Sequence, residues 1–155
     1  MKTKQKNSTL KKTIFIILII FVAIQFFPTE KNVSSVPSGK VFVDTFKANT
    51  KVNAILSASC YDCHSNNTRY PWYSNVRPIS WFLANHISKG KEKLNFDELP
   101  SFGPRKVSSK FTQIIHQIDE EKMPLKSYQA IHKEAKLSKE DRQLLVDFFN
   151  SKIKN

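Results

Sequence analysis

Apolar residues recur at the spacing of a helix face in four segments of the chain, and no segment alternates as a half-buried strand would. The segments predict helices over about 51–64, 78–90 and 108–120 and a fourth from Ser138 onward. Ser138 and Asp141 have the spacing of a capping box, with Asp in place of the preferred Glu. The apolar faces comprise Val52, Ile55, Leu56 and Cys60; Ile79, Phe82, Leu83 and Ile87; Phe111, Ile114, Ile115 and Ile118; and Leu144, Leu145, Phe148 and Phe149. The pattern predicts an all-α fold, a small helical bundle.

A different pattern occupies the N-terminus. Residues 1–12 contain five Lys and no acidic residue, and residues 14–27 are then apolar except for Gln25. A basic start followed by an apolar run is typical of a targeting segment. The run is short for a spanning helix, which needs about 20 residues, but Lys11 and Lys12 can snorkel and extend it. We expect one uncleaved transmembrane helix, a signal anchor over 13–27. A removed signal peptide is the alternative, although no small-residue cleavage site directly follows the run.

This N-terminus predicts the organisation of the whole chain. Basic residues flanking a membrane segment stay on the cytoplasmic side. We therefore expect a basic cytoplasmic region over 1–12, the anchor over 13–27, a linker rich in Pro, Ser and Lys over 28–40, and one exported domain over 41–155. The predicted location is the bacterial cytoplasmic membrane, crossed once, with the C-terminal domain on the periplasmic, extracytoplasmic side.

The formal net charge of +12 is not taken as a nucleic-acid signal. Residues 1–40 contribute half of it, with seven Lys against one Glu, and the remaining basic residues are scattered among 12 acidic ones. A solvated basic surface is the plain interpretation. Docking to an acidic redox partner protein is the alternative, because opposite charges steer such encounters.

The chain has two cysteines, and both lie in Cys60-Tyr61-Asp62-Cys63-His64. The C-x-x-C-H spacing is the attachment signature of a c-type haem. Each thiol adds to one vinyl group of the porphyrin, and the histidine that follows binds the iron as proximal ligand. The motif predicts one covalent haem, bound through Cys60 and Cys63 with His64 on the iron. Such attachment takes place outside the bacterial cytoplasmic membrane, in agreement with the N-terminal segment.

The same spacing of two cysteines also occurs in other kinds of site. A thioredoxin-like redox pair follows a strand, and nothing before Cys60 predicts one. A structural zinc site needs two further ligands at short spacing, whereas His116 and His132 are 16 residues apart. A disulfide between residues three positions apart closes too small a loop to stabilise much. Haem is therefore favoured.

The sixth coordination position of the iron has few candidate ligands. Met123 is the only methionine after the start residue, and Pro124 stiffens the loop that presents its thioether. His/Met ligation is a common pairing in cytochromes c, so we expect Met123 to be the ligand. A Met that fills a gap in the core is the plain alternative. His86, on the apolar side of the second predicted helix, is the rival ligand, ahead of His116 and His132.

Three aromatic residues follow the haem motif in Thr68-Arg69-Tyr70-Pro71-Trp72-Tyr73. Such a proline-stiffened stretch could form a wall at one edge of a porphyrin. Arg69 or Arg77 would bind a propionate by charge-assisted hydrogen bonds, and Trp72 or Tyr73 would donate to the same group. Ordinary core aromatics and surface arginines are the equally weighted alternative.

Cys60–Tyr73, read as CYDCHSNNTRYPWY, closely resembles a bacterial haem-binding domain family of short membrane-anchored proteins. The resemblance covers about residues 45–150 and continues through Pro78–Trp81, Gly90-Lys91, Leu94–Phe96, Lys122–Leu125, Tyr128, Ile131-His132 and Ala135–Ser138. It implies a cytochrome-c-like helical domain with haem on Cys60 and Cys63 and iron on His64. Similarity to cytochromes implies Met123 as distal ligand. The family pattern ends the Leu94–Phe96 stretch with a Trp, whereas this chain has Asp97-Glu98-Leu99. The packing role of the Trp position is therefore in doubt.

Two classes of function fit these expectations. The first is a membrane-tethered mono-haem electron carrier with His/Met ligation, which needs a saturated iron. The second is a haem-based sensor or peroxidase-like protein with an open or labile sixth site. A single haem and the lack of a clear distal acid–base pair argue against an enzyme. Haem binding or storage without turnover is a third, structural possibility.

Overall fold

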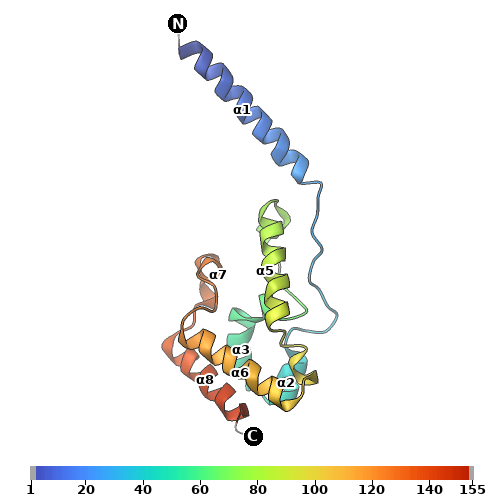
Figure 1. The fold of residues 1–155 in the computed structure, drawn as a ribbon, viewed down its shortest axis with the longest axis vertical. Coiled ribbons are helices and arrows are strands. Elements are labelled where there is room, and N and C mark those ends of the chain that lie inside the picture. The colour runs from blue at the N-terminus through green and yellow to red at the C-terminus, as the bar shows by residue number, and fades with distance from the viewer. Residues whose placement is uncertain (1–2, 154–155) are drawn as a thin grey trace. The chain divides into compact units, whose positions relative to one another are not determined.

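The computed structural model describes the backbone of residues 3–153 and the side chains of residues 8–153. The all-α prediction is confirmed, since the described residues form eight α-helices and no strand (Figure 1). The α-helices are α1 Thr3–Ile24, α2 Lys40–Phe46, α3 Thr50–Ser59, α4 Tyr61–His64, α5 Ile79–Lys93, α6 Pro104–Asp119, α7 Lys126–Ile131 and α8 Lys139–Ile153. Three short 3₁₀ turns join them, η1 Trp72–Asn75, η2 Leu99–Ser101 and η3 Lys133–Ala135.

The chain divides into two compact units. The first unit contains the residues up to Lys31 together with Tyr70–Asn85, and the second contains Asn32–Arg69 together with His86 onward. Helix α5 begins in the first unit and ends in the second. The boundaries expected after residues 12, 27 and 40 remain predictions, and residues 1–2 and 154–155 of the expected terminal segments lie outside the described residues.

The second unit is held together by an aromatic core. The side chains of Phe42, Phe96, Phe111 and Phe149 are almost completely buried. The ring of Phe42 lies 5.0 Å from that of Phe96, and the rings of Phe111 and Phe149 are 5.2 Å apart, which are favourable distances for aromatic pairs. These residues come from α2, α6, α8 and the segment before η2, and α6 packs along α8 (Figure 1). Burial of four rings fixes these elements around one centre.

Local signals explain most helix boundaries. The Oγ atom of Ser138 accepts the backbone N–H of Asp141 at 3.0 Å, and Asp141 Oδ2 accepts the Ser138 hydroxyl at 2.9 Å. The predicted cap at the start of α8 is therefore confirmed. Asn49 caps α3 through a 2.9 Å bond from Val52 N–H to its Oδ1.

The prediction of one continuous helix over 51–64 was wrong. The backbone of Cys60 has φ −128° and ψ −45°, which ends α3 and begins α4. The second predicted helix continues past Gly90 to Lys93, and α2 and α7 were not predicted at all. Both missed helices are short, with seven and six residues, so their apolar periodicity is weak.

Helix α1 contains most of the expected anchor. Its large apolar side chains from Ile14 to Val22 are 43–64 % exposed. In the part of the chain that the structure describes, no helix has the length and apolar character needed to cross a membrane. The anchor over 13–27 thus stays a prediction.

Candidate functional site

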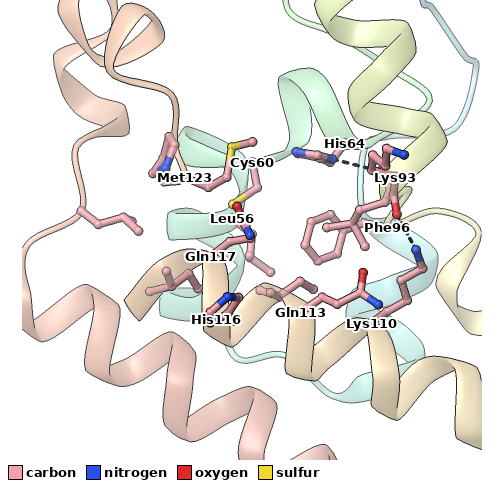
Figure 2. A pocket seen from close by; sticks show the side chains of 15 residues that line it. Leu56, Cys60, His64, Lys93, Phe96, Lys110, Gln113, His116, Gln117 and Met123 are labelled. Carbon is pink, nitrogen blue, oxygen red and sulfur yellow. Dashed lines mark hydrogen bonds between the residues drawn. The ribbon is translucent and has the colours of Figure 1, made fainter. Parts of the chain in front are cut away.

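The second unit contains an open, largely apolar pocket of about 320 Å³. Its walls come from the end of α3, the haem motif, the segment after α5, helix α6 and the Met123-Pro124 loop (Figure 2). The apolar lining consists of Leu56, Leu94, Phe96, Ile114, Ile118, Pro124 and Leu137. Cys60, His64 and Met123 line the same pocket. Three residues that the sequence proposed for one site are thereby brought together.

The ring of His64 is oriented by backbone carbonyls. Its Nδ1 atom lies 3.0 Å from the carbonyl oxygen of Gly90 and 3.0 Å from that of Leu94. A carbonyl oxygen only accepts, so Nδ1 must carry the proton, and Nε2 keeps its lone pair. Burial lowers the pKa of His64, against the opposing effect of the two backbone hydrogen bonds. A neutral imidazole with a hydrogen-bonded Nδ1–H is the form that binds a metal through Nε2.

Cys60 and Cys63 are free thiols and form no disulfide. The carbonyl oxygen of Cys60 accepts the N–H groups of Cys63 at 3.2 Å and His64 at 3.0 Å, which makes the motif one tight helical turn. Burial raises the pKa of Cys60 to about 12, and burial together with nearby Asp62 raises that of Cys63 to about 11. Both thiols are therefore protonated at neutral pH. Cys60 lines the pocket and Cys63 lies beside it, outside the lining.

Met123 follows α6 on a loop whose path is fixed by that helix. The carbonyl oxygen of Gln117 accepts the backbone N–H of Lys122 at 3.0 Å and that of Met123 at 3.2 Å. Pro124 is buried, whereas the side chain of Met123 is 37 % exposed. Figure 2 shows Met123 and His64 to either side of Cys60, from separate elements.

The rival histidines differ in position. His116 lines the pocket from α6, with Nε2 3.2 Å from a carboxylate oxygen of Glu120. His132 stacks on Tyr128 with 4.4 Å between ring centres and does not line the pocket. His86 lies on α5 and is also outside the lining. Of the three, only His116 shares the pocket with His64.

Comparison with known proteins identifies the cofactor. The model of the haem-binding domain family matches residues 19–151. The chain belongs to the haem-binding domain family. Neither the curated proteins nor the solved structures gave a match. The predicted family and the predicted haem cofactor are confirmed, while covalent attachment and the two axial ligands are not tested by this match.

The pocket of this haem-binding domain suits a haem chemically. Its walls are apolar, as the porphyrin face requires, and its donor atoms are an imidazole nitrogen and sulfur atoms, which are ligands that haem iron accepts. His64 would hold the iron through Nε2. Among the described residues, no group of three or more His, Cys, Asp or Glu is arranged to hold a bare metal ion.

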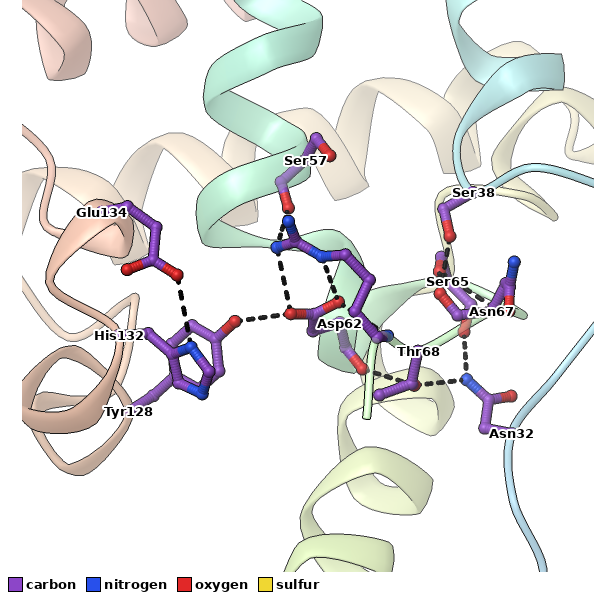
Figure 3. Close-up of polar contacts among 11 residues, drawn as sticks. Asn32, Ser38, Ser57, Asp62, Ser65, Asn67, Thr68, Tyr128, His132 and Glu134 are labelled. Carbon is purple, nitrogen blue, oxygen red and sulfur yellow. Dashed lines mark hydrogen bonds and ion pairs between the residues drawn. The ribbon is translucent and has the colours of Figure 1, made fainter. Parts of the chain in front are cut away.

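Arg69 makes different contacts from those expected. Its backbone N–H, Nε and Nη2 all lie 3.1 Å from carboxylate oxygens of Asp62, and Nη2 donates to the Ser57 carbonyl at 2.8 Å (Figure 3). Asp62 is 7 % exposed, so the guanidinium neutralises a buried carboxylate. Arg69 does not line the pocket, and its expected contact with a propionate stays a prediction.

The other predicted propionate partners, Trp72, Tyr73 and Arg77, belong to the first unit. Arg77 Nε donates to the Phe27 carbonyl at 3.2 Å, and its Nη1 donates to the Asn75 carbonyl at 2.7 Å. None of the three lines the pocket of the second unit, and their role at the haem stays a prediction.

Sequence reasoning missed several residues that build the site. Tyr128 donates to Asp62, and Asp97 accepts the N–H of Asn66 at 2.7 Å and that of Gly39 at 2.8 Å. Asp97 thus orders the chain just after the haem motif, and Leu99, at the position where the family pattern has Trp, is buried in the core. The spacing of Leu56 and Cys60, one helical turn apart, could have placed Leu56 in the pocket. No sequence signal pointed to the carbonyls of Gly90 and Leu94.

Proposed function

We propose that the chain is a c-type haem protein that works as a mono-haem electron-transfer module. One haem is attached through Cys60 and Cys63, with His64 and Met123 as its axial ligands. The observation that supports this most is a single apolar pocket lined by Cys60, His64 and Met123. The C-x-x-C-H spacing supports covalent attachment.

When bound, the haem supplies one-electron redox chemistry at its iron. The residues of the chain would tune this chemistry in three ways. The carbonyls of Gly90 and Leu94 fix the His64 ring and raise its basicity as a ligand. The apolar walls would make the surroundings of the haem less polar, and a thioether ligand from Met123 would favour a raised reduction potential.

A haem sensor or peroxidase-like protein with a labile sixth site is the second candidate. The side chain of Met123 is 37 % exposed and belongs to a loop, so an external ligand could compete for its place. His116 also lines the pocket, 3.2 Å from Glu120. Carbon monoxide binding to the reduced protein separates the two candidates, because a carrier with a closed sixth site binds it slowly or not at all.

We also propose that α1 attaches the protein to the bacterial cytoplasmic membrane, with the haem pocket on the extracytoplasmic side. The continuous exposed apolar surface of α1 supports contact with lipid. Haem attachment outside the cytoplasm agrees with the basic residues that precede this helix. A redox partner protein with an acidic docking surface would suit the basic charge of the chain.

The test of covalent attachment is production of the full chain in a host that has the c-type attachment machinery. Peroxidase staining of a denaturing gel and a pyridine haemochrome spectrum then report the bond. We expect stained wild-type protein, a shifted haemochrome when either Cys60→Ala or Cys63→Ala leaves one thioether, and no stain when both are replaced. Ser57→Ala, on the preceding turn of α3, is the matched control and should stain as wild type. Haem that leaves the wild type on acid-acetone extraction would overturn the proposal.

A further inference from the structure

Exposed aromatic side chains gather in the first unit. Trp72 is 80 % exposed, Phe26 78 %, Phe27 65 % and Trp81 38 %. Within residues 8–153, every exposed Phe or Trp belongs to this unit, and each Phe of the second unit is buried or half-buried. Such a concentration marks an interaction surface, because soluble surfaces seldom hold several large aromatic side chains together.

Hydrogen bonds join Trp81 and Arg77 to the chain at the end of α1. The indole Nε1–H of Trp81 donates to the Phe27 carbonyl at 3.1 Å, and Arg77 Nε donates to the same oxygen at 3.2 Å. Gln25 Nε2 donates to the Arg77 carbonyl at 3.1 Å, and Gln25 Oε1 accepts the Arg77 N–H at 3.0 Å. These bonds explain why a single glutamine interrupts the apolar run, and they hold residues 77–81 beside the point where α1 ends.

The chemistry of the first unit fits a lipid surface better than a protein surface. The apolar side chains of α1 lead directly into Phe26 and Phe27. Close in sequence to these aromatics the unit has two basic residues, Lys31 and Arg77, against Glu30, a balance that suits anionic headgroups; its other five Lys precede residue 13. Trp is enriched where hydrocarbon meets headgroups, because its ring is apolar and its N–H is polar.

We propose that Phe26, Phe27, Trp72 and Trp81 form an interfacial surface that lies in the headgroup region of a bilayer, beside the end of α1. The proposal rests on the membrane attachment of α1 proposed above and adds a second contact, made by residues distant in sequence. The segment that follows the haem motif is then a membrane contact as well as part of the chain path to α5.

The two tryptophans of the chain, Trp72 and Trp81, both lie in the interfacial surface, so tryptophan emission, excited at a wavelength that tyrosine does not absorb, reports on this surface alone. The full haem-loaded chain is reconstituted into vesicles of phosphatidylethanolamine with a minority of phosphatidylglycerol. Matched vesicles contain a phospholipid brominated either near the headgroup or deep in the acyl chain. The haem dims each indole to an extent that depends on its distance, so brominated and plain vesicles are compared for one variant at a time, and their emission ratio reports lipid contact. Trp72→Phe and Trp81→Phe variants assign the signal to one ring each.

The control moves the reporter to the second unit. Ile131→Trp in a Trp72→Phe, Trp81→Phe background places an indole at a site that is 65 % exposed on α7. We expect shallow bromines to quench Trp72 and Trp81 more than deep ones do, with little quenching at position 131. Protein that floats with vesicles while neither native Trp is quenched overturns the interfacial surface and points to a protein partner or a second copy, with the α1 attachment intact. Stronger quenching by deep bromines also overturns it. If the protein does not float with the vesicles, both the membrane attachment of α1 and the interfacial surface are overturned. The haemochrome spectrum of the same protein still tests the haem proposal separately.

Discussion

The hydroxyl group of Tyr128 donates a 2.6 Å hydrogen bond to Oδ2 of Asp62, a residue 66 positions earlier in the chain. Asp62 lies between the two cysteines of the haem motif, and Tyr128 lies on α7, shortly after the Met123-Pro124 loop. This bond therefore joins the segment proposed to bind the haem to the segment proposed to supply its sixth ligand (Figure 3).

Tyr128→Phe removes this bond and leaves a buried carboxylate with one donor fewer. Loss of a hydrogen bond to a charged group costs about 1.5–3 kcal/mol, so we expect a decrease of that size in the free energy of unfolding. The loop bearing Met123 should also loosen, and imidazole should bind the ferric protein more tightly. Denaturant unfolding and an imidazole titration measure the two effects. Ser127→Ala, on the same helix, should change neither, and an unaltered imidazole affinity in Tyr128→Phe would show that the bond does not position the loop.

The same tyrosine predicts a loss of stability at alkaline pH. Burial, followed by the hydrogen bond to Asp62, raises the pKa of Tyr128 above its ordinary value. The unfolded chain then releases this proton at lower pH than the folded chain does. The contribution to stability is full below about pH 10, the pKa of an unfolded tyrosine, and is lost as the pH rises beyond it. The free energy of unfolding of the wild type, measured against pH, should fall in this range.

Tyr128→Phe lacks the titrating hydroxyl and should show a shallower alkaline decline. Some decline remains, because burial also raises the pKa of Tyr61. Parallel curves for wild type and variant would contradict the assignment of the effect to Tyr128.

Gly90→Ala is expected to disturb the haem motif from the opposite side. A Cβ atom at Gly90 would lie 2.6 Å from the carbonyl oxygen of Cys63, a backbone atom that cannot move aside without displacing the motif. Alanine favours a helix by about 1 kcal/mol, but overpacking costs about 1–3 kcal/mol. We expect net destabilisation by denaturant unfolding and a shifted reduction potential, since the Gly90 carbonyl also accepts from His64.

Gly103→Ala is the matched control for this steric effect. A Cβ atom at Gly103 meets nothing within 4 Å, and the residue has φ −63°, which alanine adopts easily. Gly103 is the N-cap residue of α6, where alanine caps less well than glycine, so we expect a loss of under about 1 kcal/mol. Equal destabilisation by the two substitutions would mean that close packing against Cys63 is not the cause.

Helical spacing and short motifs predicted the parts of the structure that depend on neighbours in sequence. The apolar stripe of α6 and the Ser138–Asp141 cap are such local features, and both were found. The break at Cys60 was missed because the apolar stripe continues through it, while backbone bonds to Cys60 close a separate turn.

Polar contacts were harder to predict. Arg69 was expected at a propionate, because an arginine beside a haem motif has an obvious anionic partner in the cofactor. In the structure Arg69 pairs with Asp62, which lies within the motif and is buried with it, while the contact with a propionate stays a prediction. The sequence contains no periodic signal for such pairs, and the same holds for the Gly90 and Leu94 carbonyls at His64.

Met123→Leu tests the proposed sixth ligand at nearly constant side-chain volume. The substitution removes the thioether and keeps an apolar side chain at the pocket, so the fold should change little. We expect loss of the low-spin optical spectrum, a lower reduction potential and rapid carbon monoxide binding to the reduced protein, because the sixth position opens. His116→Ala and His86→Ala remove the rival ligands and should keep the wild-type spectrum. An unchanged spectrum and potential in Met123→Leu, together with a high-spin spectrum in His116→Ala, would instead assign the sixth position to His116, the other candidate in the pocket.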